Sequence, residues 1–321
     1  MAHRQRQHRH AGGAALRSCA SRRLWRLAAW LSLAPVLVST GCSSAAGSAS
    51  QAPPWKQVWA DNFDGPANSS VNGSSWQFDT GRGIFGTGEI ETMTASPYNA
   101  HLDGHGNLDI IVLGHGAANS PGAAWTSARI KTTRLFGAPA DGEMMVTASI
   151  RQPGAAHALG YWPGFWMLPP TGWPTTGEID ILEDVNGLSK TSGTLHCGNL
   201  TDRNPDGTTG PCHEKSGLGS GLRDCPGCQQ GFHTYSVIVD RRNAGHEQIR
   251  WYLDGHQFYR VNESRIGQAA WTAAIDHGFS ILLNVAVGGA FPDAKCGCTT
   301  PDAQTSSQGT MVVQYVKVFR N

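Results

Sequence analysis

The stretch Gly177–Asp184, which reads GEIDILED, constrains the fold of this chain more than any other. It contains four acids, and three of them are interleaved with Ile179, Ile181 and Leu182. Like charges crowded into an apolar run disfavour one another's ionisation, so such a cluster is costly. Proteins usually tolerate that cost only where the charges carry out chemistry or bind a metal. The stretch is therefore the first candidate for a functional site.

The spacing of Glu178, Asp180 and Glu183 favours a strand over a helix. On a helix, Glu178 and Asp180 would lie about 200° apart and Asp180 and Glu183 about 300° apart, so the three would share no face. On a strand, Glu178 and Asp180 share a face, whereas Glu183 would point the other way. A single β-bulge between Asp180 and Glu183 inserts one residue and returns Glu183 to that face. We therefore expect a bulged strand with three carboxylates in a row on one side of a sheet.

Strand signals recur at short intervals along the rest of the chain, and no long amphipathic helix interrupts them. In Gln248–Val261, the pair Asp254-Gly255 suits a two-residue type I′ turn, which predicts a hairpin. A short helix is expected around Gly267–Ile275. The other β-rich runs, most of them bounded by Gly, Pro, Asn or Asp, are Leu108–Leu113, Ser127–Lys131, Met144–Ile150, Thr234–Val239, Ser280–Val287 and Met311–Phe319.

This density of strands and turns predicts an all-β fold, either a sandwich or a barrel. We expect a β-sandwich, a two-sheet jelly roll with one concave face. Composition is uniform from Trp55 onward, which predicts one domain over residues 55–321. Before it, residues 43–54 (SSAAGSASQAPP) are mostly small and cannot build a core, so they are expected to form a flexible tether.

Residues 1–42 have the pattern of an export signal. They contain seven Arg and no acid, and the apolar run Leu27–Val38 is followed by small residues. The segment Ser21–Trp25 (SRRLW) resembles a twin-arginine motif. Thr40-Gly41-Cys42 resembles a bacterial lipobox, in which Cys42 would carry the lipid anchor, with simple secretion as the alternative. The apolar run is too short for a good membrane span, which needs about 20 residues.

Removal of this leader makes the chain acidic. Lys+Arg falls from 25 to 18 because seven Arg are lost, while Asp+Glu stays at 24, so the net charge becomes 18 − 24 = −6. Binding of nucleic acid depends on Lys and Arg that neutralise phosphates, so a nucleic-acid partner is not expected. The charge fits a neutral substrate. We expect an exported monomer, either secreted or lipid-anchored at the cell surface.

Six cysteines follow the leader: Cys197, Cys212, Cys225, Cys228, Cys296 and Cys298. An even number in an exported chain indicates disulfides. Cys197–Cys212 is the most natural bridge, because it closes the Gly/Pro-containing loop between them, and the partners of the other four stay open. The competing interpretation is a zinc site from Cys225-x-x-Cys228 and Cys296-x-Cys298. An oxidising compartment and the unusual second spacing argue against it.

Three carboxylates in a row suit the hydrolysis of a glycosidic bond. That reaction needs one carboxylic acid to protonate the leaving oxygen and one carboxylate opposite it. An acid between them raises the proton affinity of its neighbours, as a general acid near neutral pH requires. Trp162, Trp166 and Trp173 lie just upstream, and indole rings can stack on sugars. Trp162 and Trp166 would share a strand face; the alternative is that some of these residues are core.

These motifs identify a family resemblance. GEIDILED, preceded by Gly160–Pro169 (GYWPGFWMLP), resembles glycoside hydrolase family 16 and its laminarinase-type (endo-β-1,3-glucanase) branch. That branch carries E-x-D-x-x-E, whereas the lichenase and xyloglucan branch carries E-x-D-x-E. Further matching segments, in order, are Trp59–Gly65, Gly88–Glu91, Leu102–Leu108, Thr126–Ile130, Thr194–His196, Phe232–Tyr235, Trp251–Gly255 and Leu283–Gly289. The resemblance implies a concanavalin A-like jelly roll with a concave substrate cleft and a catalytic domain over 55–321.

The resemblance also implies catalytic roles. Glu178 would be the nucleophile that forms a glycosyl-enzyme intermediate. Glu183 would be the general acid and then the base that activates water. Asp180 would hold the two carboxyls in place and tune their protonation. His196 would hydrogen-bond near the cleaved bond; the alternative is a structural histidine beside Cys197.

Substrate-binding candidates come from the same resemblance. Besides Trp162, Trp166 and His196, these are Asn99 and Arg129, and Arg129 could equally be structural.

Two departures from the family pattern concern a metal and the substrate site. Many bacterial members bind a structural calcium with an Asp in the last strand, where this chain has Gln314, so calcium is not expected there. No other metal or cofactor is expected. Where many laminarinases have Gly-Gly-x-Trp-Pro, this chain has Gly288–Pro292 with Phe291, which keeps an aromatic surface but lacks the indole donor.

The sequence therefore predicts a retaining endo-glycosidase that acts on laminarin-like β-1,3-glucan, with a neutral polysaccharide as its partner. One alternative keeps the mechanism but changes the substrate: a mixed-linkage β-glucan or galactan hydrolase, or a transglycosylase. The acidic charge makes a sulfated polymer less attractive. Another alternative is a non-catalytic glucan-binding protein, but such proteins typically lose the catalytic acids that are all present here.

Overall fold

Strands make up nearly all of the regular structure in the computed structural model, which describes residues 54–83, 85–115 and 124–321. The predicted leader at 1–42 and all but the last residue of the predicted tether at 43–54 lie outside these ranges. Residues 51–321 cluster as one compact unit. Among the described residues, no helix is both long and apolar enough to span a bilayer.

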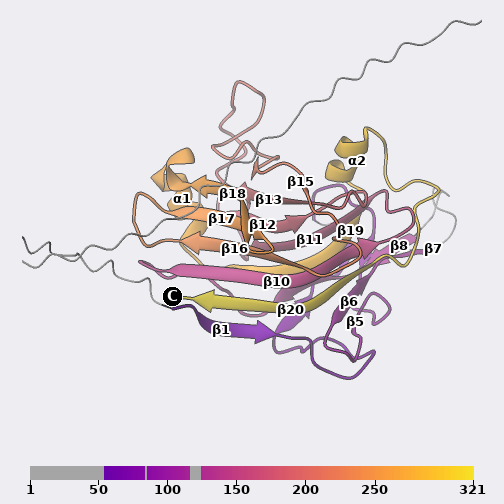
Figure 1. Ribbon diagram of the computed structural model, residues 1–321. Helices are drawn as coiled ribbons and strands as arrows, with labels where there is room; N and C mark the ends of the chain where they lie inside the picture. Colours follow the sequence, from indigo (N-terminus) through magenta and orange to yellow (C-terminus); the bar gives the residue numbers. More distant parts are fainter. Residues whose placement is uncertain (1–53, 84, 116–123) are drawn as a thin grey trace, which may run out of the picture. The chain divides into compact units, whose positions relative to one another are not determined.

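The first sheet has the order β18-β17-β16-β10-β20-β6-β5, with β1 also paired to β20 (Figure 1). All of its neighbouring strands are antiparallel. Its strands are β1 (Lys56–Asp61), β5 (Ala100–Leu102), β6 (Leu108–Ile111), β10 (Glu143–Gly154), β16 (His233–Asp240), β17 (Gln248–Leu253), β18 (His256–Asn262) and β20 (Thr310–Arg320).

The second sheet has the order β14-β13-β12-β11-β19-β9-β2, with β15 also paired to β13. Its strands are β2 (Trp76–Phe78), β9 (Arg129–Thr132), β11 (Tyr161–Leu168), β12 (Glu178–Glu183), β13 (Lys190–His196), β14 (Leu218–Gly219), β15 (Arg223–Asp224) and β19 (Ser280–Val287). A small third sheet joins β3 (Gly81–Arg82), β4 (Thr92–Met93), β8 (Ala124–Ser127) and β7 (Leu113–His115).

The hydrophobic core combines side chains from both large sheets. Val146 and Trp251 from the first sheet, and Phe165, Ile179 and Leu283 from the second, are each 0% exposed and belong to one continuous cluster. Burial of apolar surface is worth roughly 25 cal/mol per Å², so this layer is the main stabilising contact between the sheets. Two antiparallel sheets packed face to face are a β-sandwich, which confirms the predicted all-β class.

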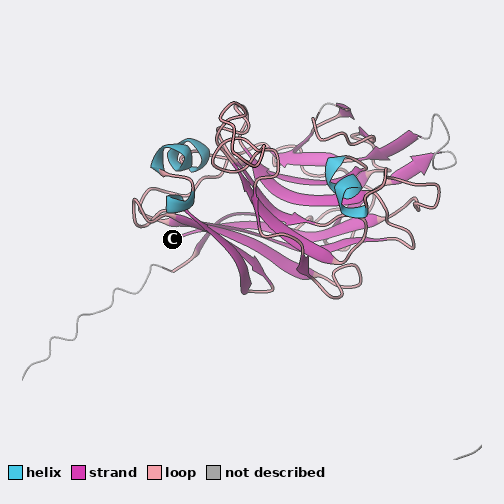
Figure 2. Ribbon diagram, turned by 90° about the horizontal axis from the view of Figure 1, so that it is seen from above, coloured by secondary structure: helices cyan, strands magenta, loops and turns pink. Residues whose placement is uncertain are grey.

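The predicted hairpin is confirmed. Asp254 and Gly255 both have positive φ, 49° and 77°, as a type I′ turn between β17 and β18 requires. The short helix expected near residues 267–275 is α1 (Gln268–Ile275), preceded by the 3₁₀ turn η1 (Glu263–Arg265). A second helix, α2 (Ala290–Cys296), was not predicted, because its seven residues include Pro292 and are too few for a helical pattern. The two α-helices lie at well-separated places along the sandwich (Figure 2).

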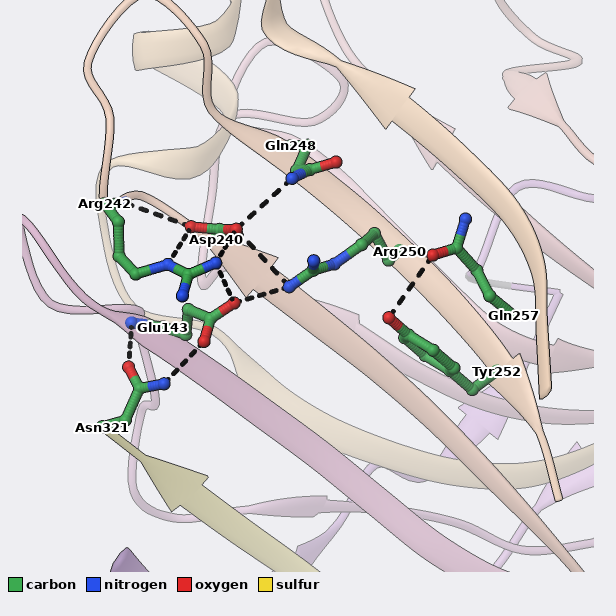
Figure 3. Close-up of polar contacts among 8 residues, drawn as sticks. All are labelled: Glu143, Asp240, Arg242, Gln248, Arg250, Tyr252, Gln257 and Asn321. Atoms are coloured by element: carbon green, nitrogen blue, oxygen red, sulfur yellow. Dashed lines mark hydrogen bonds and ion pairs between the residues drawn. The ribbon is translucent and has the colours of Figure 1, made fainter. Parts of the chain in front are cut away.

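A network of charges ties together strands of the first sheet (Figure 3). Arg242 holds Asp240 through two bonds, from Nε to Oδ1 at 2.9 Å and from Nη2 to Oδ2 at 2.7 Å. Glu143 Oε1 lies 2.5 Å from Arg250 Nη2, and Glu143 Oε2 accepts from the side-chain amide of Asn321. Burial acts to raise the pKa of Asp240, but the bonds from Arg242 outweigh it and lower that pKa to about 2.

Three disulfides connect the described cysteines. Cys197–Cys212 is present, as the sequence predicted. The four cysteines that the sequence left open pair locally, as Cys225–Cys228 and Cys296–Cys298. Each of these two motifs is thus paired within itself, and the cysteines of one are not bonded to those of the other.

Candidate active site

The predicted β-bulge lies between Asp180 and Glu183. On β11, the consecutive residues Phe165 and Trp166 pair with Leu182 and Asp180 of β12, so Ile181 is the extra residue. The pairing of β12 with β13 shifts at the same place. Because of this extra residue, Glu183 points to the same face of the sheet as Asp180, although it lies three residues further along the strand.

The bulge separates the apolar and acidic side chains of β12. Ile179, Ile181 and Leu182 are each 0% exposed in the core. Glu178 and Glu183 are partly exposed, and Asp180 is buried with 3% of its surface exposed. The three acids interact electrostatically with one another, which confirms the predicted row of carboxylates on one side of the sheet.

The core supports the strand at the bulge. Trp251 of β17, in the opposite sheet, donates its indole N–H to the backbone carbonyl of Asp180 at 2.7 Å. The backbone at Gly193 of β13 leaves room for this ring, because a Cβ there would lie 2.3 Å from Trp251 Cδ1. The position of the middle carboxylate thus depends on a contact between the two sheets.

Burial and like charge raise the pKa values of both glutamic acids. Burial is the largest influence on Glu178, whose pKa lies well above its ordinary value; Asp180 adds to the shift and His196 opposes it. Burial and then Asp180 raise the pKa of Glu183 to about 8, while the hydrogen bond from Trp162 works against them. The acids form a coupled set that retains a proton at neutral pH.

His196 faces the acids from the neighbouring strand. It pairs with Glu178 across β12 and β13, and its Nε2 lies 3.4 Å from Asp180 Oδ2. Its Nδ1 lies 2.8 Å from Glu214 Oε2. Burial disfavours the charged ring, but the contacts with Asp180 and Glu214 outweigh it and raise the pKa of His196 well above its ordinary value. The structure therefore brings His196 into the site, where these contacts favour its protonated form.

Glu214 was not identified from the sequence. It belongs to a loop that follows Cys212, shows no periodicity and contains no segment typical of the family. Its side chain is fully buried, and its Oε1 accepts the backbone N–H of Cys197 at 2.8 Å. Only the fold shows that this acid lies beside His196, because 18 residues separate the two in the chain.

Trp162 and Trp166 both lie on β11, four residues apart, as the predicted shared strand face requires. Trp162 Nε1 donates to Glu183 Oε1 at 2.9 Å, and the Trp162 ring meets Phe291 edge-on with centroids 5.7 Å apart. Trp166 Nε1 donates to Asn284 Oδ1 at 2.8 Å. Both rings are partly exposed, and neither belongs to the core cluster.

Arg129 borders the same group of residues. Its guanidinium lies over the rings of Phe85 and Trp166, at 4.1 and 4.6 Å from their centroids. Its Nε lies 3.3 Å from Asp79 Oδ2, and its charge also interacts with Glu178. Only 8% of the residue is exposed, so its contacts within the protein favour the structural role over direct binding of glucan.

The structure argues against Asn99 as a substrate-binding residue. Only 2% of it is exposed. Its Nδ2 donates to the carbonyl of Ile111 at 3.0 Å and to Thr126 Oγ1 at 3.1 Å, and its Oδ1 accepts from Thr94 at 2.7 Å. An amide that is buried and bonded on both sides has nothing to offer a sugar, so this prediction is corrected.

The acids and His196 also have the geometry of a possible metal site. One ligand atom each from Glu178, Asp180 and His196 lie within 4.8 Å of one another. A histidine binds a metal only as the neutral ring, however, and both nitrogens of His196 face carboxylates. The arrangement fits proton transfer better than ligation. At the place of the family's calcium ligand, Gln314 Oε1 accepts from Ser149 Oγ at 2.7 Å.

Comparison with known proteins gives a consistent result. Residues 100–229 match the family described as XgeA-like, catalytic GH16 domain. A β-glucanase from Rhodothermus marinus is 29% identical over 301 residues, which cover 88% of this chain and 92% of that protein. The crystal structure of an endo-1,3-β-glucanase from Streptomyces sioyaensis has 43% sequence identity and a TM-score of 0.74, covering 84% of this chain and 98% of the other.

A laminarinase from Rhodothermus marinus has the same fold, with a TM-score of 0.64 and 27% identity over 84% of this chain and 98% of that one. These structures share the jelly-roll sandwich that the sequence predicted. The bulged E-x-D-x-x-E strand and the match to nearly the whole length of the Streptomyces enzyme agree. The chain belongs to glycoside hydrolase family 16, in its laminarinase-type branch.

Proposed function

We propose that this glycoside hydrolase is a retaining endo-β-1,3-glucanase that cleaves neutral, laminarin-like polymers. The observation that carries the proposal is the bulge, which puts Glu178 and Glu183 on one face with Asp180 between them. Retaining glycosidases need two carboxyls in complementary protonation states. Glu183, whose pKa is raised to about 8, fits the role of the acid. The pKa of Glu178 is raised as well, so its role as the nucleophile rests on its place opposite His196 across β12 and β13 and on the motif.

The first step forms a covalent intermediate. The Glu178 carboxylate attacks the anomeric carbon while Glu183 gives its proton to the departing glycosidic oxygen. In the second step, Glu183, now ionised, takes a proton from a water molecule, which displaces Glu178 and restores the β configuration. Asp180 interacts with both glutamic acids and would shift the proton affinity of each as charge moves between them.

The choice of β-1,3-glucan rests on the relatives and on the character of the site. Related proteins named as acting on this linkage include the Streptomyces enzyme and a glucan endo-1,3-β-glucosidase from Niallia circulans, 28% identical over 283 residues. Trp162 and Phe291 supply adjoining aromatic surfaces beside Glu183. Stacking on the apolar face of a sugar requires no charge on the substrate.

The location of the enzyme is also a proposal. The Arg-rich and apolar pattern of residues 1–42 supports export, and Cys42 supports a lipid anchor with secretion as the alternative. The disulfides among the later cysteines fit an oxidising compartment. We propose a monomeric enzyme at or beyond the cell surface, without a cofactor.

Product analysis tests the proposed substrate and mode of action. Purified enzyme is incubated with laminarin, lichenan and agarose, and the products are sized over time, with Glu178→Gln as the inactive control. We expect laminarin to give short oligosaccharides early, as internal cleavage does, and agarose to remain intact. Faster cleavage of lichenan or agarose would overturn the β-1,3 assignment, and release of single sugars from the start would overturn the endo mode.

A further inference from the structure

The carboxyl of Glu214 occupies the side of His196 that faces away from Asp180. Both of its oxygens are used: Oε2 lies 2.8 Å from His196 Nδ1, and Oε1 accepts the Cys197 N–H at 2.8 Å. The carboxyl cannot exchange these contacts for water, because the side chain has no exposed surface. A buried carboxyl fixed at both oxygens is a rigid support for the ring.

The loop that carries Glu214 also restricts the position of the ring. Cys197, adjacent to His196, is bonded to Cys212, two residues before Glu214. A Cβ at Gly217 would lie 3.0 Å from His196 Cε1, so the backbone of the loop packs directly against the imidazole. The loop closed by this disulfide therefore fixes the Glu214 carboxyl relative to the His196 ring.

The titratable groups that face His196 are all carboxyls. Asp180, Glu178 and Glu183 approach from β12, and Glu214 approaches from the loop. The ring of Trp173 also lies nearby, with its centroid 6.0 Å away. A hydrogen on Nδ1 is needed for the bond to Glu214, and a second on Nε2 favours the contact with Asp180. Two protonated nitrogens make the ring a cation.

We propose that Glu214 is a positioning residue of the glycosidase reaction: it holds the His196 ring as an imidazolium with Nε2 directed at Asp180. The role rests on the proposed function of this site. The cation then offsets negative charge among the three acids and favours the ionised form of Glu178, which pairs with it across β12 and β13, and also that of Glu183. A neutral histidine in the same place would leave the carboxylates without that counter-charge, and their mutual repulsion would favour a second proton.

Glu214→Gln tests the proposal, because it removes the charge and keeps an oxygen that can accept the Cys197 N–H. We expect kcat on laminarin to fall about tenfold or more while KM changes little, as when a carboxylate that orients a catalytic histidine is replaced by its amide. The matched control is Asp206→Asn on the same loop, where an exposed aspartate pairs with His213. That variant should keep the wild-type kcat.

The protonation of His196 is the readout that a merely structural role would not change. In NMR titrations of ¹⁵N-histidine-labelled protein, Glu214→Gln should lower the pKa of His196 by about one unit or more. Glu214→Asp, which keeps the charge on a shorter side chain, should lower it less and recover part of kcat; it also serves as the test if the Gln variant does not fold.

An unchanged His196 titration, or an unchanged kcat in Glu214→Gln, would overturn the role of Glu214 alone. Wild-type protein without activity on laminarin would overturn the proposed function, whatever the NMR titration gives.

Discussion

The proton on Glu183 connects the burial of this residue with its chemistry. Burial is the main reason that its pKa rises to about 8, and Asp180 contributes further. An exposed glutamic acid, with a pKa of about 4.3, would be ionised at neutral pH and could not protonate a leaving group. The pKa of about 8 favours the protonated form of this residue at neutral pH, as its proposed role as the general acid requires.

The pH dependence of kcat should therefore show an alkaline limb near pH 8. Above this pH the ionised fraction of Glu183 grows, and kcat should fall about tenfold per pH unit. Trp162→Phe removes a hydrogen bond that favours the ionised form, so it should raise the pKa and move the limb to higher pH. Profiles measured on laminarin with both proteins check this; a limb that moves to lower pH in the variant would contradict it.

The three acids could be located from the sequence because strand geometry and one bulge determine which way each points. The burial of Asn99 could not be predicted, because the residue type alone gives no sign that its amide is bonded to Thr94 and Ile111. Glu214 could not be found either, since its contact with His196 depends on the path of a loop. Sequence spacing predicts neighbours on one strand, but not neighbours from distant segments.

At the scale of a single element, β12 depends on the opposite sheet. The indole of Trp251 donates to the Asp180 carbonyl at the bulge, inside the core. A buried carbonyl that loses its partner costs about 1–3 kcal/mol. This contact therefore contributes both to stability and to the position of the catalytic strand.

Trp251→Phe should lower the free energy of unfolding by about 1–3 kcal/mol through the lost hydrogen bond. The smaller ring leaves a cavity, which should lower it further. It should also lower kcat, because Asp180 is the residue at the bulge. Trp271→Phe is the matched control: this buried indole donates to Glu247 Oε2 at 2.7 Å and not to β12. Urea unfolding and kcat are measured for both variants. Similar stability losses with equal kcat in both would contradict a link between Trp251 and the site.

Some secondary-structure elements can be predicted from local sequence, and others depend on distant contacts. The hairpin at Asp254-Gly255 was predicted because two positive φ values are a local property of those residue types. Helix α2, which places Phe291 against Trp162, was missed because its formation depends on surrounding contacts such as the bond between Asp293 and Thr300. A tight turn can thus be predicted from its residue types alone, whereas a short helix in a loop depends on contacts with distant residues.

At the scale of the whole molecule, the alternation of strands and turns predicted two layers but not the order of strands within them. Sheet neighbours such as β10 and β20 lie far apart in the chain, and their pairing is set by the shared core. The charged network around Asp240 and Glu143 (Figure 3) is likewise visible only after β10, β16 and β17 come together.

This network should make the stability of the fold depend on pH in the acidic range. The pKa of Asp240 is lowered from 3.8 to about 2 in the folded protein, so its stabilising contribution is present above pH 3.8 and is lost as the pH falls toward 2. Asp240→Asn should lower Tm by a few degrees at pH 6, and the difference from wild type should shrink near pH 2. Asp224→Asn, at an exposed pair with Lys190, should change Tm little at either pH. A constant difference across this range would contradict the assignment.

The anomeric configuration of glycosyl azides tests the roles of Glu178 and Glu183 most directly. The substrate is an aryl β-glucoside of a laminari-oligosaccharide whose leaving group needs no proton, supplied with azide to Glu178→Ala and to Glu183→Ala. Without the nucleophile, azide attacks once and should give the α-glycosyl azide; without the acid/base, azide should intercept the glycosyl-enzyme and give the β-glycosyl azide. The same anomer from both variants, the reverse assignment, or full activity on laminarin without Glu178 would contradict the proposed mechanism.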